Sequence, residues 1–319
     1  MGEFELIDKY FKVAHHRKDV VLGPGDDCAL LTLPPDTQLA VSTDTLVSGV
    51  HFLPEMDPVD LGYKALAVNL SDLAAMGAEP RWVSLTLTLP AINEPWVAGF
   101  AEGFLELAEY YNVALVGGDM TRGPLSITVS VKGTVPSGKA LLRSGAKAGD
   151  GIYVTGTLGD AALALSHLLA RRTLNENQLA AVLPRLDHPH PRILAGQALR
   201  GIANAALDLS DGLASDLGHV LRASGVRAQI DLDALPLSPV LQDAVSPEQA
   251  WQLALAGGDD YELLFTVPEE HRGVLDTALA HSGVKFTRIG RILAGEPGIE
   301  WLLADKPVSL TPKGWDHFA

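Results

Sequence analysis

The stretch Lys64-Ala65-Leu66-Ala67-Val68-Asn69-Leu70-Ser71-Asp72-Leu73-Ala74-Ala75-Met76-Gly77 decides how the first half of the chain folds. It predicts a long helix, which Asp57-Pro58 opens with aspartate as N-cap and proline at the first helical position. Gly77 ends this helix. Asn69 and Asp72 lie three residues apart and share one of its faces. Burying a carboxylate on so alanine-rich a helix is costly without a cation, so the stretch predicts Asp72 as a metal ligand.

Strands flank this helix. Residues 82–89 and 125–131 alternate apolar and polar side chains with period two, which predicts two half-buried antiparallel strands. The shorter runs 39–42 and 113–116 predict strands that deliver Asp44 and Asp119 at their C-terminal ends. The first half of the chain is therefore predicted to be an α+β domain.

The second half alternates strands and helices, which predicts an α/β domain. Strands are expected at 152–155, 227–232, 262–267 and 284–292, helices near 160–171, 192–205, 214–223 and 268–281, and loops at 173–178 and 184–191. The boundary is placed at residue 148. Residues 1–148 form the predicted N-terminal domain, and residues 149–319 form the predicted C-terminal domain.

Composition narrows the function. A chain of 319 residues fits two domains, and its formal charge of −15 argues against nucleic acid as a partner. Cys28 is the single cysteine, which rules out an internal disulfide, fits a reducing compartment and is expected to be buried. Neither a signal peptide nor a run of about 18 apolar residues is found, so we expect a soluble cytoplasmic protein without a membrane partner.

Aspartate recurs beside glycine, serine or threonine in six short motifs. They are Gly23-Pro24-Gly25-Asp26-Asp27, Ser42-Thr43-Asp44-Thr45, Asn69-Leu70-Ser71-Asp72, Gly117-Gly118-Asp119, Asp208-Leu209-Ser210-Asp211-Gly212 and Gly257-Gly258-Asp259-Asp260-Tyr261-Glu262. Hard oxygen ligands of this kind suit Mg²⁺, which binds one or two carboxylates together with substrate phosphates. Taken together, the motifs predict a metal-dependent enzyme that acts on phosphates.

Several familiar enzyme classes are excluded by missing motifs. The chain has no Walker A sequence, no protein-kinase signature set and no HExxH pattern. Nucleotide phosphates would then be held by metal ions, backbone N–H groups and a few cations.

The motifs closely resemble those of the thiamine-monophosphate kinase family over essentially the whole chain. The resemblance rests on Gly25-Asp26-Asp27-Cys28-Ala29-Leu30, Ser42-Thr43-Asp44-Thr45-Leu46-Val47, residues 64–78, Gly117-Gly118-Asp119, Thr121-Arg122-Gly123-Pro124, Arg143-Ser144-Gly145-Ala146, Asp208-Leu209-Ser210-Asp211-Gly212 and Asp260-Tyr261-Glu262-Leu263. It implies the two-domain architecture of the aminoimidazole ribonucleotide synthetase-like superfamily. The α+β N-terminal domain, residues 1–148, would bind ATP and Mg²⁺ and dimerise through its sheet, and the α/β C-terminal domain, residues 149–319, would complete the ATP and substrate site in the cleft between the domains. It also implies transfer of the ATP γ-phosphate to thiamine monophosphate, giving thiamine diphosphate.

The resemblance also assigns roles to residues. Mg²⁺ would be bound by Asp27, Ser42, Thr43, Asp44, Asp72, Asp119, Asp208 and Asp211. ATP would be contacted by Gly118, Arg143 and Ser210, with Tyr111 as a weaker candidate. Thiamine monophosphate would be contacted by His51, Glu262 and Trp315. No residue is an obvious general base, and an acceptor that is already an ionised phosphate requires none.

The residues by themselves leave some of these roles open. Arg143 could present a fork of donors to a phosphate, but it fits a surface arginine as well, and a lone histidine such as His51 is more often structural. Trp315 could stack on a cationic ring. Two alternatives remain: another ATP-dependent enzyme of the same superfamily, and a non-catalytic protein that binds Mg²⁺ or nucleotide.

Overall fold

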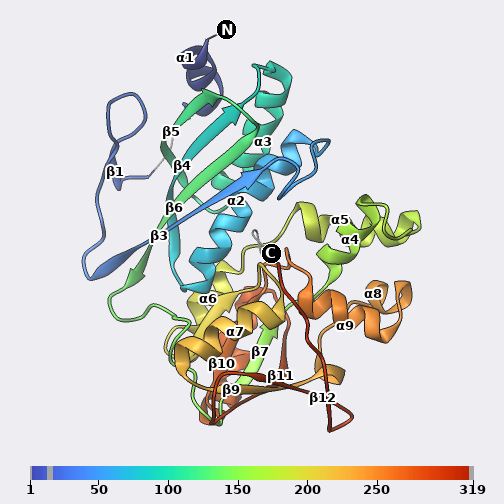
Figure 1. The fold of residues 1–319 in the computed structure, drawn as a ribbon. Coiled ribbons are helices and arrows are strands. Elements are labelled where there is room, and N and C mark those ends of the chain that lie inside the picture. Colours follow the sequence, from blue (N-terminus) through green and yellow to red (C-terminus); the bar gives the residue numbers. More distant parts are fainter. Residues whose placement is uncertain (1, 13–16, 316–319) are drawn as a thin grey trace. The chain divides into compact units, whose positions relative to one another are not determined.

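The computed structural model describes residues 2–12 and 17–315, which form two compact units (Figure 1). Unit 1 consists of Met1–Leu73 and Ala78–Gly138, and unit 2 of Ala74–Gly77 and Lys139–Ala319. The predicted boundary at residue 148 therefore falls shortly after the start of unit 2. Among the described residues, no helix is long and apolar enough to cross a membrane.

Unit 1 is an α+β domain built on a four-stranded sheet in the order β3-β6-β4-β5. Strand β4 runs parallel to β5 and antiparallel to β6, which pairs antiparallel with β3. Its elements are α1 (Glu3–Leu6), the short helix η1 (Ile7–Phe11), β1 (Val20–Leu22), β2 (Leu30–Leu31), β3 (Thr37–Val47), α2 (Pro58–Ala75), β4 (Glu79–Leu89), α3 (Glu94–Tyr110), β5 (Ala114–Arg122) and β6 (Ser126–Pro136).

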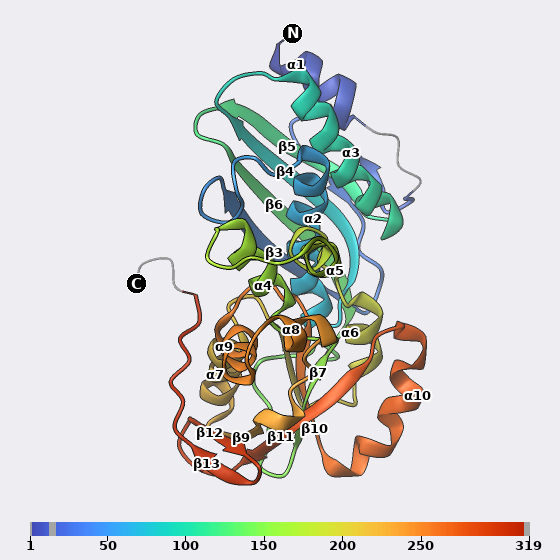
Figure 2. The same ribbon diagram turned by 90° about the vertical axis from the view of Figure 1, so that its right-hand side faces the viewer.

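Helices α2 and α3 lie against one face of this sheet, and Figure 2 shows them in front of it. The predicted start of α2 is confirmed, since the Asp57 side chain accepts the Val59 N–H at 2.8 Å. The two helices touch through glycine: a Cβ on Gly103 would lie 1.9 Å from the Val59 carbonyl oxygen, and one on Gly62 would lie 2.1 Å from that of Phe100. Larger side chains there would push the helices apart.

Unit 2 is an α/β domain around a seven-stranded sheet, ordered β13-β12-β9-β11-β7-β10-β8. Every pairing in it is antiparallel except that of β12 with β9. Figure 2 shows α10 on one side of the sheet, and α7 and α9 on the other. The strands are β7 (Gly151–Thr155), β8 (Ala205–Asp208), β9 (Arg227–Asp231), β10 (Leu263–Val267), β11 (Phe286–Leu293), β12 (Ile299–Leu303) and β13 (Lys306–Val308). The helices are α4 (Asp160–Leu168), α5 (Glu176–Asp187), α6 (Ile193–Leu199), α7 (Leu213–Ser224), η2 (Leu232–Ala234), α8 (Pro239–Ala244), α9 (Pro247–Ala256), η3 (Glu269–Val274), α10 (Leu275–Leu279) and η4 (Ala280–Ser282).

Some predicted details are wrong. Asp44 lies within β3 and Asp119 within β5, not beyond the strand ends. Pro184 was expected in a loop but lies inside α5. Cys28 is exposed rather than buried, because it follows the turn between the short strands β1 and β2.

An ion-pair cluster fastens the start of the chain to β4 in unit 1. Asp19 accepts hydrogen bonds from Arg17 Nε at 2.9 Å and from Arg81 Nη1 at 2.8 Å. Burial alone would raise the pKa of Asp19, but the two arginines outweigh burial and lower it from 3.8 to about 2. A depressed pKa means that this carboxylate stabilises the fold above its unfolded pKa, and that the contribution is lost as the pH falls towards about 2.

We expect Asp19→Asn to lower the free energy of unfolding by about 2 kcal/mol at neutral pH, because it leaves two arginines without their shared carboxylate. Urea unfolding followed by circular dichroism measures this, and the difference from wild type should shrink between about pH 4 and pH 2. Asp8→Asn is the control, since Asp8 pairs with Lys12 on the surface and its side chain is 66% exposed. Equal losses in both variants would contradict the expectation.

Candidate active site

In unit 1, Ser42, Asp44 and Asp72 come together where β3 crosses α2. The Ser42 hydroxyl donates to Asp72 at 2.5 Å, and the Asp44 backbone N–H donates to Asn69 Oδ1 at 3.1 Å. The Asn69 amide donates in turn to the Ala65 carbonyl one helical turn earlier, at 3.0 Å, and Asn69 is fully buried. The helix face predicted from the spacing of Asn69 and Asp72 is therefore confirmed, and it faces β3.

Thr43 and Asp119 belong to the opposite face of the same sheet. Side chains alternate along a strand, so Thr43 and Thr45 point away from Ser42 and Asp44. The register pairs Thr45 with Thr128, Thr128 with Thr86 and Thr86 with Asp119, which puts these side chains in one row. Thr45 and Thr128 join through their hydroxyls at 2.9 Å. The aspartates of β3 and β5 are thus divided between two faces.

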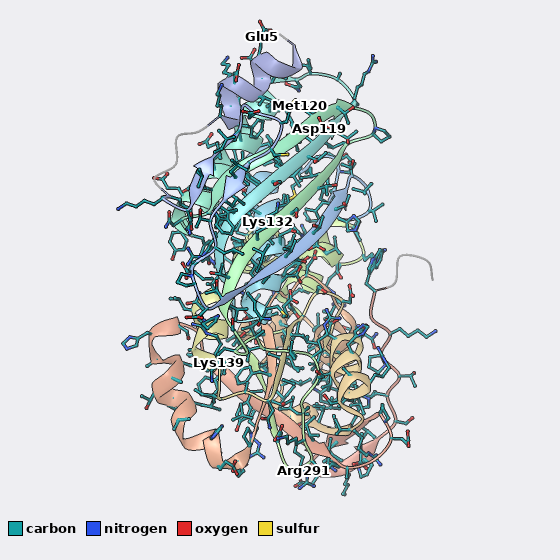
Figure 3. The ribbon with its side chains drawn as sticks, turned by 90° about the vertical axis from the view of Figure 1, so that its left-hand side faces the viewer. Glu5, Asp119, Met120, Lys132, Lys139 and Arg291 are labelled. Carbon is teal, nitrogen blue, oxygen red and sulfur yellow. The ribbon has the colours of Figure 1, made fainter. Side chains whose placement is uncertain are left out.

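Figure 3 looks onto this second face, on which Asp119 and Lys132 are labelled. Lys132 was not singled out from the sequence. Its ammonium group donates to the Ser84 hydroxyl at 2.7 Å and to the Ser130 carbonyl at 3.0 Å. Burial lowers its pKa. Lys132 therefore adds a positive charge to a face lined mainly by serine and threonine.

His51 is held in a fixed orientation at the end of β3. The Val47 backbone N–H donates to His51 Nδ1 at 2.9 Å, and the His51 backbone N–H donates to the Val47 carbonyl at 2.9 Å. An accepting Nδ1 carries no proton, so the proton of the neutral ring sits on Nε2. His51 can therefore donate one hydrogen bond to an anionic group.

The other assigned residues of unit 1 lie apart from this group. Asp27 is exposed, and its backbone N–H donates to the Asp26 side chain at 2.9 Å. Tyr111 follows α3 and makes an edge-on ring contact with Tyr110, with ring centres 4.9 Å apart. Among the described residues, no three histidine, cysteine, aspartate or glutamate side chains converge closely enough to hold a metal ion.

In unit 2, segment 208–212 is hydrogen-bonded on two sides. On one side, the backbone N–H groups of Ser210 and Asp211 donate to the Asp216 carboxylate at 3.1 Å and 3.0 Å. Burial, with the negative charge of Asp211, raises the pKa of Asp216 to about 7 despite these two bonds. Asp216, at the start of α7, was not found from the sequence, although its place in the first turn of a helix was a usable signal.

On its other side, segment 208–212 pairs with segment 257–262. The Leu209 N–H donates to the Glu262 carbonyl at 2.8 Å, the Tyr261 N–H donates to the Leu209 carbonyl at 2.8 Å, and the Asp259 N–H donates to the Ser210 carbonyl at 3.0 Å. These bonds continue the ladder of β8 and β10. Two of the six sequence motifs are thus neighbours in the structure.

The Arg143 segment and the C-terminal segment also lie on α7 or beside it. Arg143 is exposed, and the Ser224 hydroxyl at the end of α7 donates to its carbonyl at 3.3 Å. The Trp315 N–H donates to the Asp211 carbonyl at 3.1 Å, while the Trp315 side chain is 55% exposed. A Cβ on Gly314 would lie 2.6 Å from the same carbonyl oxygen, so glycine is needed for this approach. The indole is therefore presented next to a predicted metal ligand.

Glu262, for which the resemblance implies a contact with thiamine monophosphate, lies in the interior of unit 2. It is fully buried, and its carboxylate accepts hydrogen bonds from Thr155, Arg185 and Arg192. Neither arginine was identified from the sequence, because they lie 77 and 70 residues away from Glu262.

Comparison with known proteins agrees with the two-unit fold. Residues 25–135 match the family model of the N-terminal domain of AIR synthase related proteins, and residues 147–301 match that of the C-terminal domain. A hydrogenase maturation protein from Escherichia coli shares the fold, with a TM-score of 0.78 at 22% identity, 97% of each chain being covered.

Other proteins are more similar to this chain in sequence. Thiamine-monophosphate kinase of Escherichia coli K12 is 57% identical, with 100% of this chain and 98% of that protein covered. The crystal structure of thiamine-monophosphate kinase from Stenotrophomonas maltophilia K279a matches with a TM-score of 0.85 at 45% identity, covering 92% and 93% of the two chains. The structure of AaThiL complexed with AMPPCP and TMP matches with a TM-score of 0.78 at 35% identity, covering 90% and 89%. The chain therefore belongs to the AIR synthase related family and, within it, to the thiamine-monophosphate kinases.

Proposed function

We propose that this protein transfers the γ-phosphate of ATP to thiamine monophosphate, forming thiamine diphosphate and ADP. The observation that carries the proposal is the full-length identity of 57% to a thiamine-monophosphate kinase. The related AaThiL has been solved with AMPPCP, a non-hydrolysable ATP analogue, and TMP. The single cysteine fits a reducing compartment, and on that basis we place the enzyme in the cytoplasm.

We propose that Mg²⁺ ions bind the oxygen-rich motifs. The ligand candidates are Asp27, Ser42, Thr43, Asp44, Asp72, Asp119, Asp208 and Asp211. The atoms with which these residues would bind a metal are all carboxylate, hydroxyl or carbonyl oxygens. Such ligands fit a hard cation and exclude a preference for a soft one. When bound, Mg²⁺ neutralises the charge of the substrate phosphates.

The chain's own groups then position the substrates. Arg143 can donate two parallel hydrogen bonds to a phosphate, and Ser210 and Tyr111 would add contacts to the nucleotide. Gly118 packs against β4 without room for a side chain, since a Cβ there would lie 1.8 Å from the Leu85 carbonyl oxygen, so it would contact ATP through its backbone. We assign His51, through Nε2–H, and Trp315 to thiamine monophosphate.

We propose a direct in-line transfer without a general base. The attacking group is a phosphate oxygen of thiamine monophosphate, which is ionised at neutral pH, so no proton has to be removed. A new bond forms from this oxygen to the γ-phosphorus, and the bond to the ADP leaving oxygen breaks. Positioning and charge neutralisation supply most of the rate in reactions of this kind.

The test is turnover by the purified protein. With ATP, Mg²⁺ and thiamine monophosphate we expect equal amounts of thiamine diphosphate and ADP, measured by chromatography. Replacing thiamine monophosphate by thiamine controls for ATP hydrolysis and for other acceptors. Folded protein that forms no thiamine diphosphate at saturating substrates would refute the kinase and leave a non-catalytic binding protein.

We also propose a homodimer in which a second copy covers the open face of the unit 1 sheet. Apolar side chains are exposed on β3 and on the hairpin of β1 and β2: Leu39 at 46%, Val41 at 58%, Val21 at 66% and Leu30 at 54%. Exposed apolar groups of this extent are typical of an interface. Sedimentation equilibrium should give twice the mass of one chain, and a monomer at micromolar concentration would refute the dimer.

A further inference from the structure

The Glu262 carboxylate has no room for a substrate. Oε2 accepts the Thr155 hydroxyl at 2.6 Å and Arg192 Nε at 2.7 Å, and Oε1 accepts Arg185 Nη2 at 2.6 Å and Arg192 Nη2 at 2.5 Å. A carboxylate offers about four lone-pair positions, and four donors occupy them. A donor from a ligand would have to displace one of these buried groups.

The groups around Glu262 stabilise the ionised form of its side chain. Burial alone would raise its pKa, but hydrogen bonds and charges from Arg192 and Arg185 outweigh burial and lower the pKa. Gly156 leaves room for the Glu262 carboxylate, since a Cβ at that position would lie 2.0 Å from Oε1. Thr155, Arg185, Arg192 and Glu262 are called the Glu262 cluster below. The cluster joins β7, α5, the segment before α6 and the start of β10.

The backbone of Glu262 leads directly to segment 208–212. Its carbonyl accepts the N–H of Leu209, which stands between Asp208 and Ser210. Within the paired segment, Asp259 and Tyr261 adopt left-handed conformations with φ of 67° and 47°. Non-glycine residues avoid this region and stay there where their surroundings hold them. The Glu262 cluster is the buried anchor next to this strained stretch.

We propose that Arg185, Arg192 and Glu262 are positioning residues, which hold segments 208–212 and 257–262 in the conformation that binds Mg²⁺ and ATP. Glu262 acts through the backbone of Leu209 and makes no contact with thiamine monophosphate. The inference rests on the proposed function, because segment 208–212 carries Asp208, Ser210 and Asp211. In this proposal Glu262 supports the nucleotide site and does not contact the substrate.

The variant Arg192→Met tests this, since it removes two of the four bonds to Glu262, and Arg192→Lys restores the charge without the fork of donors. The matched control is Arg272→Met, which breaks an exposed pair with Glu269 in the same unit, the arginine side chain being 61% exposed. Thr155→Val, which removes one hydroxyl donor at nearly constant volume, serves if Arg192→Met does not fold.

Calorimetry with Mg²⁺ and AMPPCP should show at least about tenfold weaker nucleotide binding for Arg192→Met, partial recovery for Arg192→Lys and no change for Arg272→Met. Amide hydrogen exchange at Leu209, Asp259 and Tyr261 should be faster in Arg192→Met. In turnover assays, kcat should fall, and KM for thiamine monophosphate should rise no more than KM for ATP.

Two results would overturn the proposal. One is a rise of KM for thiamine monophosphate alone, with nucleotide binding and amide exchange unchanged, which would return Glu262 to the substrate contacts. The other is Arg192→Met behaving like Arg272→Met throughout. The binding and exchange measurements need no turnover, so an inactive wild-type protein whose variants show the expected shifts would refute the kinase and support the positioning role.

Discussion

Asp72→Asn should lower kcat at least about a hundredfold while leaving the free energy of unfolding nearly unchanged. The loss is expected because a neutral amide cannot neutralise Mg²⁺, and removal of one charged group that stabilises a transition state costs several kcal/mol. Stability should survive, because the amide oxygen of asparagine can still accept the bond from the Ser42 hydroxyl that Asp72 accepts at 2.5 Å. The half-saturating Mg²⁺ concentration should rise as well.

Steady-state kinetics over a range of Mg²⁺ concentrations, together with urea unfolding, measure both effects. Asp60→Asn is the matched control, since Asp60 lies on the same helix α2 in its first turn. Activity that survives Asp72→Asn would remove Asp72 from the metal ligands. A large loss of stability would instead make its contact with Ser42 a structural one.

Trp315→Ala should raise KM for thiamine monophosphate about tenfold and change KM for ATP little. The indole is 55% exposed and fixed by its backbone to Asp211, so it can stack on the cationic ring of the substrate without first being ordered. Stacking of a cation on an indole contributes about 1 to 2 kcal/mol, which corresponds to about a tenfold change in affinity.

Initial rates at varied concentrations of each substrate separate the two KM values. Leu310→Ala provides the control, because Leu310 belongs to the same C-terminal segment and is also partly exposed, at 37%. If KM for ATP rose as much as KM for thiamine monophosphate, the indole would serve mainly to hold the Asp211 segment.

The elements that were predicted well from the sequence are those in which apolar residues recur at regular spacing. Residues 83–89 alternate apolar and polar side chains strictly, and they form most of β4, whose antiparallel partner β6 was also predicted. Helix α2 begins after Asp57 as its cap predicts, and Gly77 beyond its end has a φ of +65°. Here local preference and tertiary packing demand the same conformation.

Elements without such a period were missed or cut short. In β3, polar residues occupy both faces, as in Ser42-Thr43-Asp44-Thr45, so the pattern could not carry the strand past Ser42. Strand β8 has four residues, Ala205–Asp208, which is too short to show alternation. Helix α3 was missed although Asn93 caps it through the Trp96 N–H and proline follows at the second position.

The candidate site divides in the same way. Asp72 was singled out because a carboxylate on an alanine-rich helix is conspicuous, and the structure places it in hydrogen-bond contact with Ser42. Asp216, Arg185 and Arg192 were not found, because their partners are set by tertiary structure and not by spacing along the chain. Sequence motifs identify residues that face a ligand more readily than those that support them.

The alternation of side chains along β3 fixes which of its residues face α2. Ser42 and Asp44 point toward α2, while Thr43 and Thr45, one step along, point to the open face. Inserting or deleting one residue between Thr37 and Val47 would exchange the two sets, turning Ser42 and Asp44 to the open face and Thr43 and Thr45 toward α2. Insertions and deletions are therefore expected in the loops on either side of β3, whereas within β3 residues can be substituted but not added or removed.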